Sequence, residues 1–271
     1  MTDAEGKGRI ALITGASAGI GEALAHVFAA HGFDLVLTAR RNHRLNALAE
    51  TLESAYGVKM HTIAADLSQA GTSEALAAKL EKDGIAVDAL VNNAGYAVPG
   101  LYRDTGWKEQ RDFLEVLVTA PCALTHLLLP GMNARRYGRI LNVASVAGFM
   151  PGSASHTLYG GAKAMMITWS QALHSEQKGT GVHVTALCPG FTITEFHDVN
   201  GTRGAMNRLP KFMWLDAKHV ALAGYEAVMK NSPICTPGRQ YKARAALVRF
   251  LPRNFAHRLG ALRSRVLTAR K

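Results

Sequence analysis

Short apolar runs alternate along the chain with longer segments in which apolar residues recur every three or four positions. Most of the short runs are apolar throughout and do not alternate with polar residues, which predicts strands covered by helices on both faces of a sheet. In chain order, the predicted strands are Arg9–Thr14, Asp34–Thr38, Lys59–Ala64, Asp88–Asn92, Arg139–Ala144, Val182–Cys188 and Pro233–Thr236.

The segments between these runs carry the helical period. Strand and helix alternate so often that the strands are expected to pair in parallel through right-handed crossovers. We therefore expect an α/β fold, a doubly wound parallel sheet of about seven strands. The predicted helices are Ile20–Ala30, Arg44–Tyr56, Ser73–Lys82, Tyr159–Lys178, Ala217–Met229 and a long segment from Trp107 to Arg136 that is interrupted near Pro121 and Pro130.

Composition and charge favour one domain with a C-terminal extension. Of the 271 residues, 48% are hydrophobic and 19% are charged, and no Pro/Ser-rich linker divides the chain, which suits a single well-buried core. All acidic residues lie at or before Glu226, whereas Arg239–Lys271 holds ten of the 31 lysines and arginines. We expect residues 1–238 to form a nearly neutral domain and residues 239–271 a basic amphipathic extension.

The extension interleaves apolar residues with arginines. We expect it to pack on the body or on a partner subunit, with contact to an anionic membrane surface as the alternative, since basic amphipathic helices lie in that interface. Nucleic-acid binding is not expected. The polar start of the chain and the lack of an apolar run of about 18 residues predict a cytoplasmic protein. Three widely spaced cysteines without CxxC spacing predict neither disulfides nor a metal site.

A glycine-rich stretch, TGASAGIG, follows the first predicted strand at Thr14–Gly21. Ligands of doubly wound sheets bind beyond the carboxyl ends of the strands. Gly15, Gly19 and Gly21 permit a tight turn and a close backbone approach, and the helix that begins near Ile20 aims free N–H groups at a pyrophosphate. Because the stretch lies between the first strand and the first helix, it predicts a dinucleotide site.

The end of the second predicted strand distinguishes between the two nicotinamide dinucleotides. An NAD site would carry an acid there to bind the ribose hydroxyls, but the sequence reads Thr38-Ala39-Arg40-Arg41. A planar guanidinium suits a 2′-phosphate, and Ser17 could add a hydroxyl donor. We therefore expect NADP(H) in preference to NAD(H), with Arg40 favoured over Arg41 as the phosphate ligand.

Polar residues also follow the third and fourth predicted strands. Asp66, which precedes Leu67, could accept a hydrogen bond from the adenine amino group or could cap the following helix, and both interpretations stay open. The stretch NNAG, Asn92–Gly95, places small residues where a cofactor would run along the strand ends. Its asparagines could tie neighbouring strands together.

Ser145 stands at the end of the fifth predicted strand, and Tyr159 opens the next helix with Lys163 four residues further on. Residues i and i+4 share a helix face, so the Lys163 ammonium is expected near the Tyr159 hydroxyl, where it would lower the pKa of that phenol. The phenol could then pass a proton to or from a substrate oxygen that Ser145 holds, while hydride moves at the nicotinamide.

Together these motifs resemble those of the short-chain dehydrogenase/reductase family over nearly all of residues 8–238. The resemblance is carried by TGASAGIG, NNAG, the serine of NVAS, YGGAK and CPGFTITEF. It implies a Rossmann fold, an NADP-dependent reaction that interconverts a small-molecule carbonyl and an alcohol, and catalytic roles for Ser145, Tyr159 and Lys163. Residues 1–238 would then be the dinucleotide-binding catalytic domain.

The resemblance also implies partners and a cofactor site. Family members are commonly homodimers or homotetramers packed through two long helices, here the one through Leu117–Leu129 and the one after Tyr159. A Pro-Gly-x-x-x-Thr stretch borders the nicotinamide carboxamide in the family. The residues expected to bind the cofactor are Gly15, Ser17, Ala18, Gly19, Ile20, Gly21, Arg40, Asp66, Leu67, Asn93, Ala94, Gly95, Tyr159, Lys163, Pro189, Gly190, Ile193 and Thr194.

One position departs from the family pattern. Many relatives carry an asparagine in the long fourth helix that holds a water linking the lysine to solvent, and by register Leu117 occupies this position. Leucine cannot hydrogen-bond a water. The alternative function is therefore a dinucleotide-binding scaffold or redox sensor with little or no turnover.

Two further features concern the substrate. His156 and His197 are candidates for substrate contact, although loop histidines are more often surface groups. The segment from His197 to Leu215 stands where family members have a substrate lid. An apolar or bulky carbonyl or alcohol would suit a mobile and partly apolar cover, which is suggested by Gly201, Gly204, Met206, Met213 and Trp214.

Overall fold

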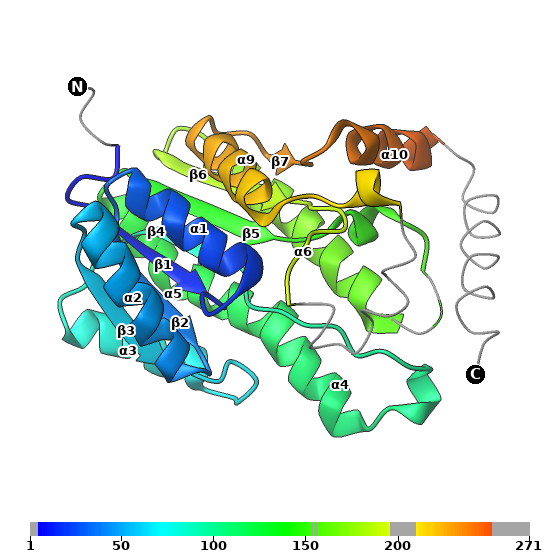
Figure 1. Ribbon diagram of the computed structural model, residues 1–271, viewed down its shortest axis with the longest axis horizontal. Coiled ribbons are helices and arrows are strands. Elements are labelled where there is room, and N and C mark those ends of the chain that lie inside the picture. The colour runs from blue at the N-terminus through cyan, green and yellow to red at the C-terminus, as the bar shows by residue number, and fades with distance from the viewer. Residues whose placement is uncertain (1–4, 153, 155–156, 196–209, 251–271) are drawn as a thin grey trace.

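The protein is described by a computed structural model, which covers residues 5–152, 154, 157–195 and 210–250. Its strands form one seven-stranded sheet in the order β3-β2-β1-β4-β5-β6-β7, and every neighbouring pair is parallel (Figure 1). The predicted doubly wound sheet is therefore confirmed. The strands are β1 (Ile10–Thr14), β2 (Asp34–Ala39), β3 (Met60–Ala64), β4 (Val87–Asn92), β5 (Gly138–Val143), β6 (Val182–Leu187) and β7 (Ile234–Cys235).

The helices cover both faces of this sheet. Four of the helices begin one or two residues earlier than predicted, namely α1, α2, α3 and α6, which were expected to start at Ile20, Arg44, Ser73 and Tyr159. The α-helices are α1 (Gly19–Ala30), α2 (Asn42–Tyr56), α3 (Thr72–Lys82), α4 (Trp107–Leu114), α5 (Ala120–Ala134), α6 (Thr157–Glu176), α9 (Ala217–Met229) and α10 (Arg239–Phe250). Short turns of other helix types are η1 (Tyr102–Asp104), η2 (Glu115–Thr119), η3 (Val146–Phe149) and η4 (Lys211–Met213).

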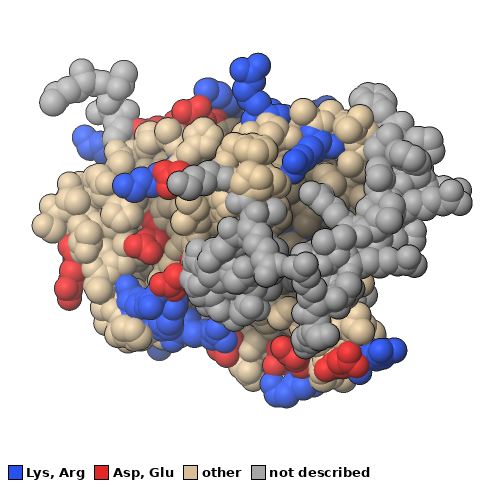
Figure 2. Space-filling view, turned by 45° about the vertical axis from the view of Figure 1, so that its right-hand side comes forward, with Lys and Arg blue, Asp and Glu red and all other residues tan. Residues whose placement is uncertain are grey.

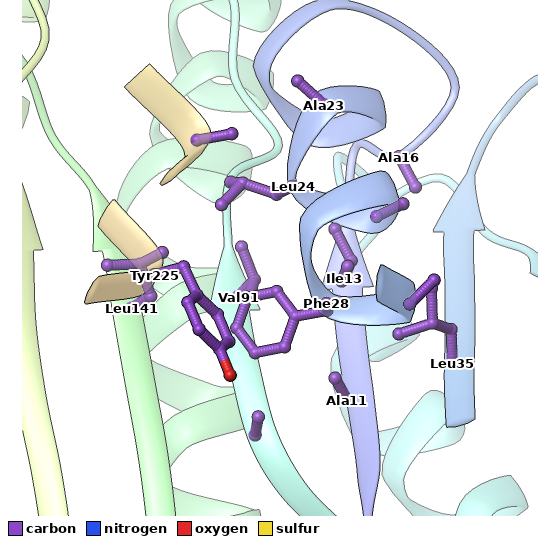
Figure 3. Packing of buried hydrophobic residues seen from close by; sticks show 14 of the residues in the cluster. Ala11, Ile13, Ala16, Ala23, Leu24, Phe28, Leu35, Val91, Leu141 and Tyr225 are labelled. Atoms are coloured by element: carbon purple, nitrogen blue, oxygen red, sulfur yellow. The ribbon is translucent and has the colours of Figure 1, made fainter. Parts of the chain in front are cut away.

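The core is divided by the sheet into two layers. Alternate residues of β1 face opposite sides: Ile13 packs with residues of α1, α2 and α9, whereas Leu12 packs with residues of α3, α5 and α6. In the first layer, Phe28 of α1 meets Tyr225 of α9 edge to face, with ring centroids 5.0 Å apart (Figure 3). Burial on both sides explains why the strands are apolar throughout.

The long apolar segment after β4 is interrupted near Pro121, as predicted, but not at Pro130. The interruption is the π-turn η2, which ends two residues before Pro121, whereas Pro130 lies inside α5. Pro121 has no N–H to donate to the carbonyl of Leu117 four residues earlier, so regular α-helical bonding is broken at that turn. By length and composition alone, Trp107–Ala134 could cross a membrane, contrary to the sequence expectation, but Leu124 and Met132 of this stretch are buried beneath the sheet.

The surface and the C-terminal helix complete the described fold. Acidic and basic side chains are interspersed over the described part of the face in Figure 2. The basic helix α10 packs back on the body through Tyr241, which is buried in the same core layer as α1 and α9. Residues 251–271 of the extension lie outside the described part of the chain. Within that part, the three cysteines are unpaired and no cluster of metal-binding side chains is found.

Candidate active site

The glycine loop connects β1 to α1 at the carboxyl edge of the sheet. Gly15 has φ +66°, and a Cβ added there would lie 2.8 Å from the Ala94 Cα. A Cβ added at Gly21 would lie 2.3 Å from the Gly15 carbonyl oxygen. Because real Cβ atoms do not approach other atoms this closely, only glycine fits at Gly15 and Gly21. The loop is therefore packed tightly against the NNAG stretch, as a close backbone turn requires.

Two polar side chains fix the loop to β4. The Thr14 hydroxyl donates to the Val91 carbonyl and accepts from the N–H groups of Asn93 and Ala94 at 2.9 and 3.0 Å. The Asn93 side chain donates to the carbonyls of Thr14 and Gly15 at 2.9 and 3.2 Å. The expectation that the NNAG asparagines tie neighbouring strands together is confirmed.

The start of α1 fits an anionic group. Its N-cap is Ala18, whose side chain offers no hydrogen bond to the first-turn N–H groups. Those N–H groups and the positive end of the helix dipole meet at the loop that bears Gly15 and Gly19. A Cβ at Gly19 would lie 3.0 Å from the Thr194 side chain, so this loop also touches the predicted nicotinamide stretch. The residues present therefore fit a dinucleotide pyrophosphate.

Arg41, and not Arg40, contacts the glycine loop. Its Nη2 and Nε donate to the Ser17 hydroxyl at 3.1 and 3.3 Å. Its Nη1 pairs with Glu195 at 3.1 Å, and Arg44 pairs with both oxygens of the same carboxylate at 2.7 and 2.8 Å. Arg40 is exposed. Sequence reasoning missed Glu195 and Arg44 because Glu195 is far along the chain from the other members of this cluster.

Asp66 lies in a turn after β3. Its Oδ1 accepts from the backbone N–H and the hydroxyl of Ser68 at 3.1 and 2.8 Å. The N-cap of α3 is Gly71, so the interpretation of Asp66 as a helix cap is wrong, while a contact to adenine stays a prediction. Leu67 is buried in a cluster that also contains Leu117 and Phe113.

Ser145, Tyr159 and Lys163 converge just beyond the end of β5. Ser145 caps η3, where its Oγ accepts from the Ala147 N–H at 3.1 Å. Tyr159 is in the first turn of α6, and Lys163 follows one turn later on the same face, with Nζ 5.9 Å from the centre of the phenol ring. Ala94 packs in the same cluster as Tyr159. The predicted catalytic set and the glycine loop are therefore neighbours at one sheet edge.

The protonation of this set differs from the expectation. Burial raises the pKa of Tyr159, and a hydrogen bond with the Ser145 side chain lowers that pKa only in part. Burial also lowers the pKa of Lys163 to about 8, because it disfavours the charged form. The Lys163 Nζ donates to the Val143 carbonyl at 2.7 Å. Within the chain, burial outweighs every lowering influence, so the net shift of this pKa is opposite to the expected one.

Leu117 lies inside the π-turn η2 and is fully buried. A Cβ added at Gly95 would lie 3.7 Å from its side chain, so Leu117 packs against the NNAG stretch. At the position where the family resemblance implies an asparagine, this chain therefore has an apolar contact. Because Pro121 has no N–H, the carbonyl of Leu117 lacks its usual helical donor.

The stretch after β6 packs closely at the same edge. The Pro189 carbonyl accepts from the Val146 N–H at 3.0 Å, which connects this stretch to the turn after Ser145. A Cβ added at Gly190 would lie 2.1 Å from the Tyr241 ring of α10, so only glycine fits there. Ile193 is 59% exposed.

Part of the expected substrate region lies outside the described residues. This applies to both histidine candidates and to most of the predicted lid, namely His156, His197, Gly201, Gly204 and Met206. Of the five residues that suggested the lid, two are described: Met213 is buried, and Trp214 stacks at a tilt on Phe191 with ring centroids 6.0 Å apart. The apolar character expected of this region therefore holds for its described part.

The chain is similar in sequence to known proteins. A family model described as short chain dehydrogenase matches residues 9–203. A very-long-chain 3-oxoacyl-CoA reductase of Phaeosphaeria nodorum is 40% identical over 185 residues, a match that covers 67% of this chain and 54% of the reductase. The chain thus spans about half the length of that relative.

Two solved structures have similar folds. A short-chain dehydrogenase from Sphingobium yanoikuyae in complex with NADPH has a TM-score of 0.79 and 30% identity, covering 90% of this chain and 96% of its own. A short-chain dehydrogenase/reductase from Burkholderia phymatum in complex with NAD has a TM-score of 0.79 and 26% identity, covering 90% of this chain and 93% of its own.

Proposed function

The chain belongs to the short-chain dehydrogenase family, and on that premise we propose that it prefers NADP(H) and uses Tyr159 as its general acid and base. Members of this family interconvert alcohols and carbonyl compounds with a nicotinamide dinucleotide. The observation that carries the proposal is the hydrogen-bonded Ser145–Tyr159 pair one helical turn from Lys163. This set lies beside a loop whose glycines leave no room for side chains.

Each residue of the set has a distinct role in the proposed reaction. When bound, the nicotinamide supplies or accepts the hydride. In reduction, Tyr159 donates its proton to the carbonyl oxygen, and Ser145 donates a hydrogen bond to the same oxygen. A raised pKa keeps the phenol protonated at neutral pH, the form that reduction needs. Lys163 binds the nicotinamide ribose and places its ammonium near the phenol.

The cofactor preference is supported by the charges beside the glycine loop. Arg41 and Ser17 are in contact, and β2 ends without an acid. Arg40 stays a second candidate for the 2′-phosphate. Among the similar structures one holds NADPH and one NAD, so the preference is our proposal for this chain. Gly15, Gly19 and the start of α1 would hold the pyrophosphate.

We also propose how the protein assembles and where it acts. Leu127 on α5 and Met165 on α6 are 41% and 38% exposed, which supports a homodimer or homotetramer packed through these two helices. Tyr241 supports packing of the extension on the body, at least in its first turns. We propose a cytoplasmic location, with peripheral membrane contact as the alternative role of the basic extension.

A panel of carbonyl compounds tests the reaction. NADPH consumption is followed by absorbance, with apolar and bulky ketones and aldehydes in the panel and Tyr159→Phe as the matched variant. The proposal expects consumption by the wild type and its loss in the variant. Consumption that the variant leaves unaffected would contradict the mechanism. Leu117 motivates the rival function, a dinucleotide-binding scaffold or redox sensor, and NADPH binding without consumption of any substrate would favour it.

A further inference from the structure

A charged cluster beside the glycine loop has no part in the proton transfer. Arg41 contacts the Ser17 hydroxyl through Nη2 at 3.1 Å and directs Nη1 to Glu195, also at 3.1 Å. Arg44 holds the same carboxylate at 2.7 Å. Glu195 directly follows Thr194, whose side chain lies against Gly19. The carboxylate therefore connects the predicted nicotinamide stretch with the arginines beside the glycine loop.

The cluster is an anion site that a carboxylate of the chain already fills. Arg41 and Arg44 stand at the N-terminus of α2, whose first turn has no acidic residue, so two cations add to the positive end of the helix dipole. Hydrogen bonds from Arg44 and then from Arg41 hold the pKa of Glu195 below its ordinary value. Glu195 therefore stays ionised and supplies the negative charge that this helix end lacks.

A 2′-phosphate would need the same donors. It carries about −1.5 to −2 charges and three acceptor oxygens, whereas a carboxylate carries one charge and two oxygens. A guanidinium fork accepts either group. The side chains of Arg41, Arg44 and Glu195 are 37%, 41% and 44% exposed, and ion pairs at such exposure are weak. The phosphate can therefore displace the carboxylate at a modest cost in affinity.

We propose that Glu195 competes with the 2′-phosphate of the cofactor for Arg41 and Arg44, and so lowers the preference of this chain for NADP(H) over NAD(H). The inference rests on the proposed function in one respect: the nucleotide must bind along the glycine loop. On this inference, the acid that limits the preference for NADP(H) is on the stretch after β6. It is not at the end of β2, where an NAD site would carry its acid.

Binding of two adenine nucleotides tests the proposal without any turnover. Adenosine 2′,5′-bisphosphate and adenosine 5′-monophosphate differ only in the 2′-phosphate, and their affinities for the full-length chain are measured by calorimetry. Glu195→Gln is expected to bind the bisphosphate about three- to tenfold more tightly than the wild type does, with the monophosphate unchanged. Asp83→Asn, which removes one acid from an exposed pair with Lys79, is the charge-matched control and should change neither affinity.

A second variant tests whether the effect passes through the arginine. Arg41→Ala should weaken binding of the bisphosphate. In the Arg41→Ala background, Glu195→Gln should increase the affinity for the bisphosphate by a smaller factor than it does in the wild type. Unchanged or weaker bisphosphate binding in Glu195→Gln, or an equal change for the monophosphate, would overturn the inference. If neither nucleotide binds any variant, the inference fails with its premise. If both bind as expected while no carbonyl is reduced, only the proposed reaction fails.

Discussion

A tyrosine lies beside a buried cation near each end of β5, yet only one of the two ends has the groups for proton transfer. At the carboxyl end, Lys163 lies 5.9 Å from the centre of the Tyr159 ring. At the amino end, the guanidinium carbons of Arg139 and Arg9 lie 4.1 and 3.8 Å from the centre of the Tyr137 ring. Burial raises the pKa of Tyr137 as it does that of Tyr159.

The difference lies in the partners of the two hydroxyls. Tyr159 is hydrogen-bonded to Ser145, whereas the buried Tyr137 hydroxyl has no hydrogen-bond partner among the described residues. Lys163 has a pKa lowered to about 8, so it can exchange a proton near neutral pH, but an arginine such as Arg139 stays protonated. A shifted pKa beside a cation therefore does not identify a catalytic tyrosine without a second hydroxyl and an adjoining cofactor loop.

The largest effect is expected from removing the cation at the carboxyl end. Lys163→Met should lower kcat by about 10³-fold, within the range for loss of a group that supports acid–base catalysis. The reason is that the ammonium near Tyr159 and the ribose contact are both lost. Steady-state kinetics with saturating NADPH measures this. A kcat within threefold of the wild type would show that Lys163 has no part in the chemistry.

A smaller loss is expected from removing the second hydroxyl. Ser145→Ala should lower kcat by about 10²-fold, the size of the loss of one hydrogen bond to a reacting oxygen. It should also raise the pKa of Tyr159 further, since the Ser145 hydrogen bond now lowers it. Titration of the phenol, followed by the difference in tyrosinate absorbance from Tyr159→Phe, should show its profile moved to higher pH. A profile that stays in place would contradict a hydrogen bond between these two side chains.

Stability should report the burial of Lys163. Its pKa falls from 10.5 to about 8 on folding, so between these values the unfolded chain binds more protons than the folded chain. Stability therefore rises with pH across this window. From pH 7 to 9 the wild type should gain about 1 kcal/mol relative to Lys163→Met. Urea unfolding at several pH values measures the difference, and a flat difference would mean that Lys163 is not buried as a cation.

The smallest effect is expected at the amino end of β5. Tyr137→Phe removes a buried hydroxyl that has no partner among the described residues, so the free energy of unfolding should rise or stay within about 1 kcal/mol of the wild-type value. Thermal unfolding tests this. A loss of more than about 2 kcal/mol would reveal a hydrogen bond at this hydroxyl.

Local patterns predicted most of the fold and part of the site. Apolar runs and glycines act within a few residues of one another, so the seven strands, the glycine loop and the convergence of Ser145 with Tyr159 could be predicted. Contacts between distant segments could not. Arg41, and not the favoured Arg40, pairs with Glu195, which lies 154 residues away.

Two other errors have the same origin. Asp66 was open to interpretation as a helix cap because the sequence does not show where α3 begins, which is after Gly71. Nor does it show that the Asp66 carboxylate accepts a hydrogen bond from the Ser68 hydroxyl. The pKa of Tyr159 was expected to fall because spacing places Lys163 nearby. Spacing does not report how deeply the phenol is buried, and burial decides the direction of the shift.

The central claim is that Tyr159 transfers the proton and that Tyr137, which is also buried beside a cation, does not. The most direct test compares single-turnover hydride transfer in Tyr159→Phe and Tyr137→Phe, each saturated with NADPH and the same carbonyl substrate. We predict that the first variant loses about 10²- to 10⁴-fold in rate while the second keeps the wild-type rate. Equal rates in the two variants would contradict the claim.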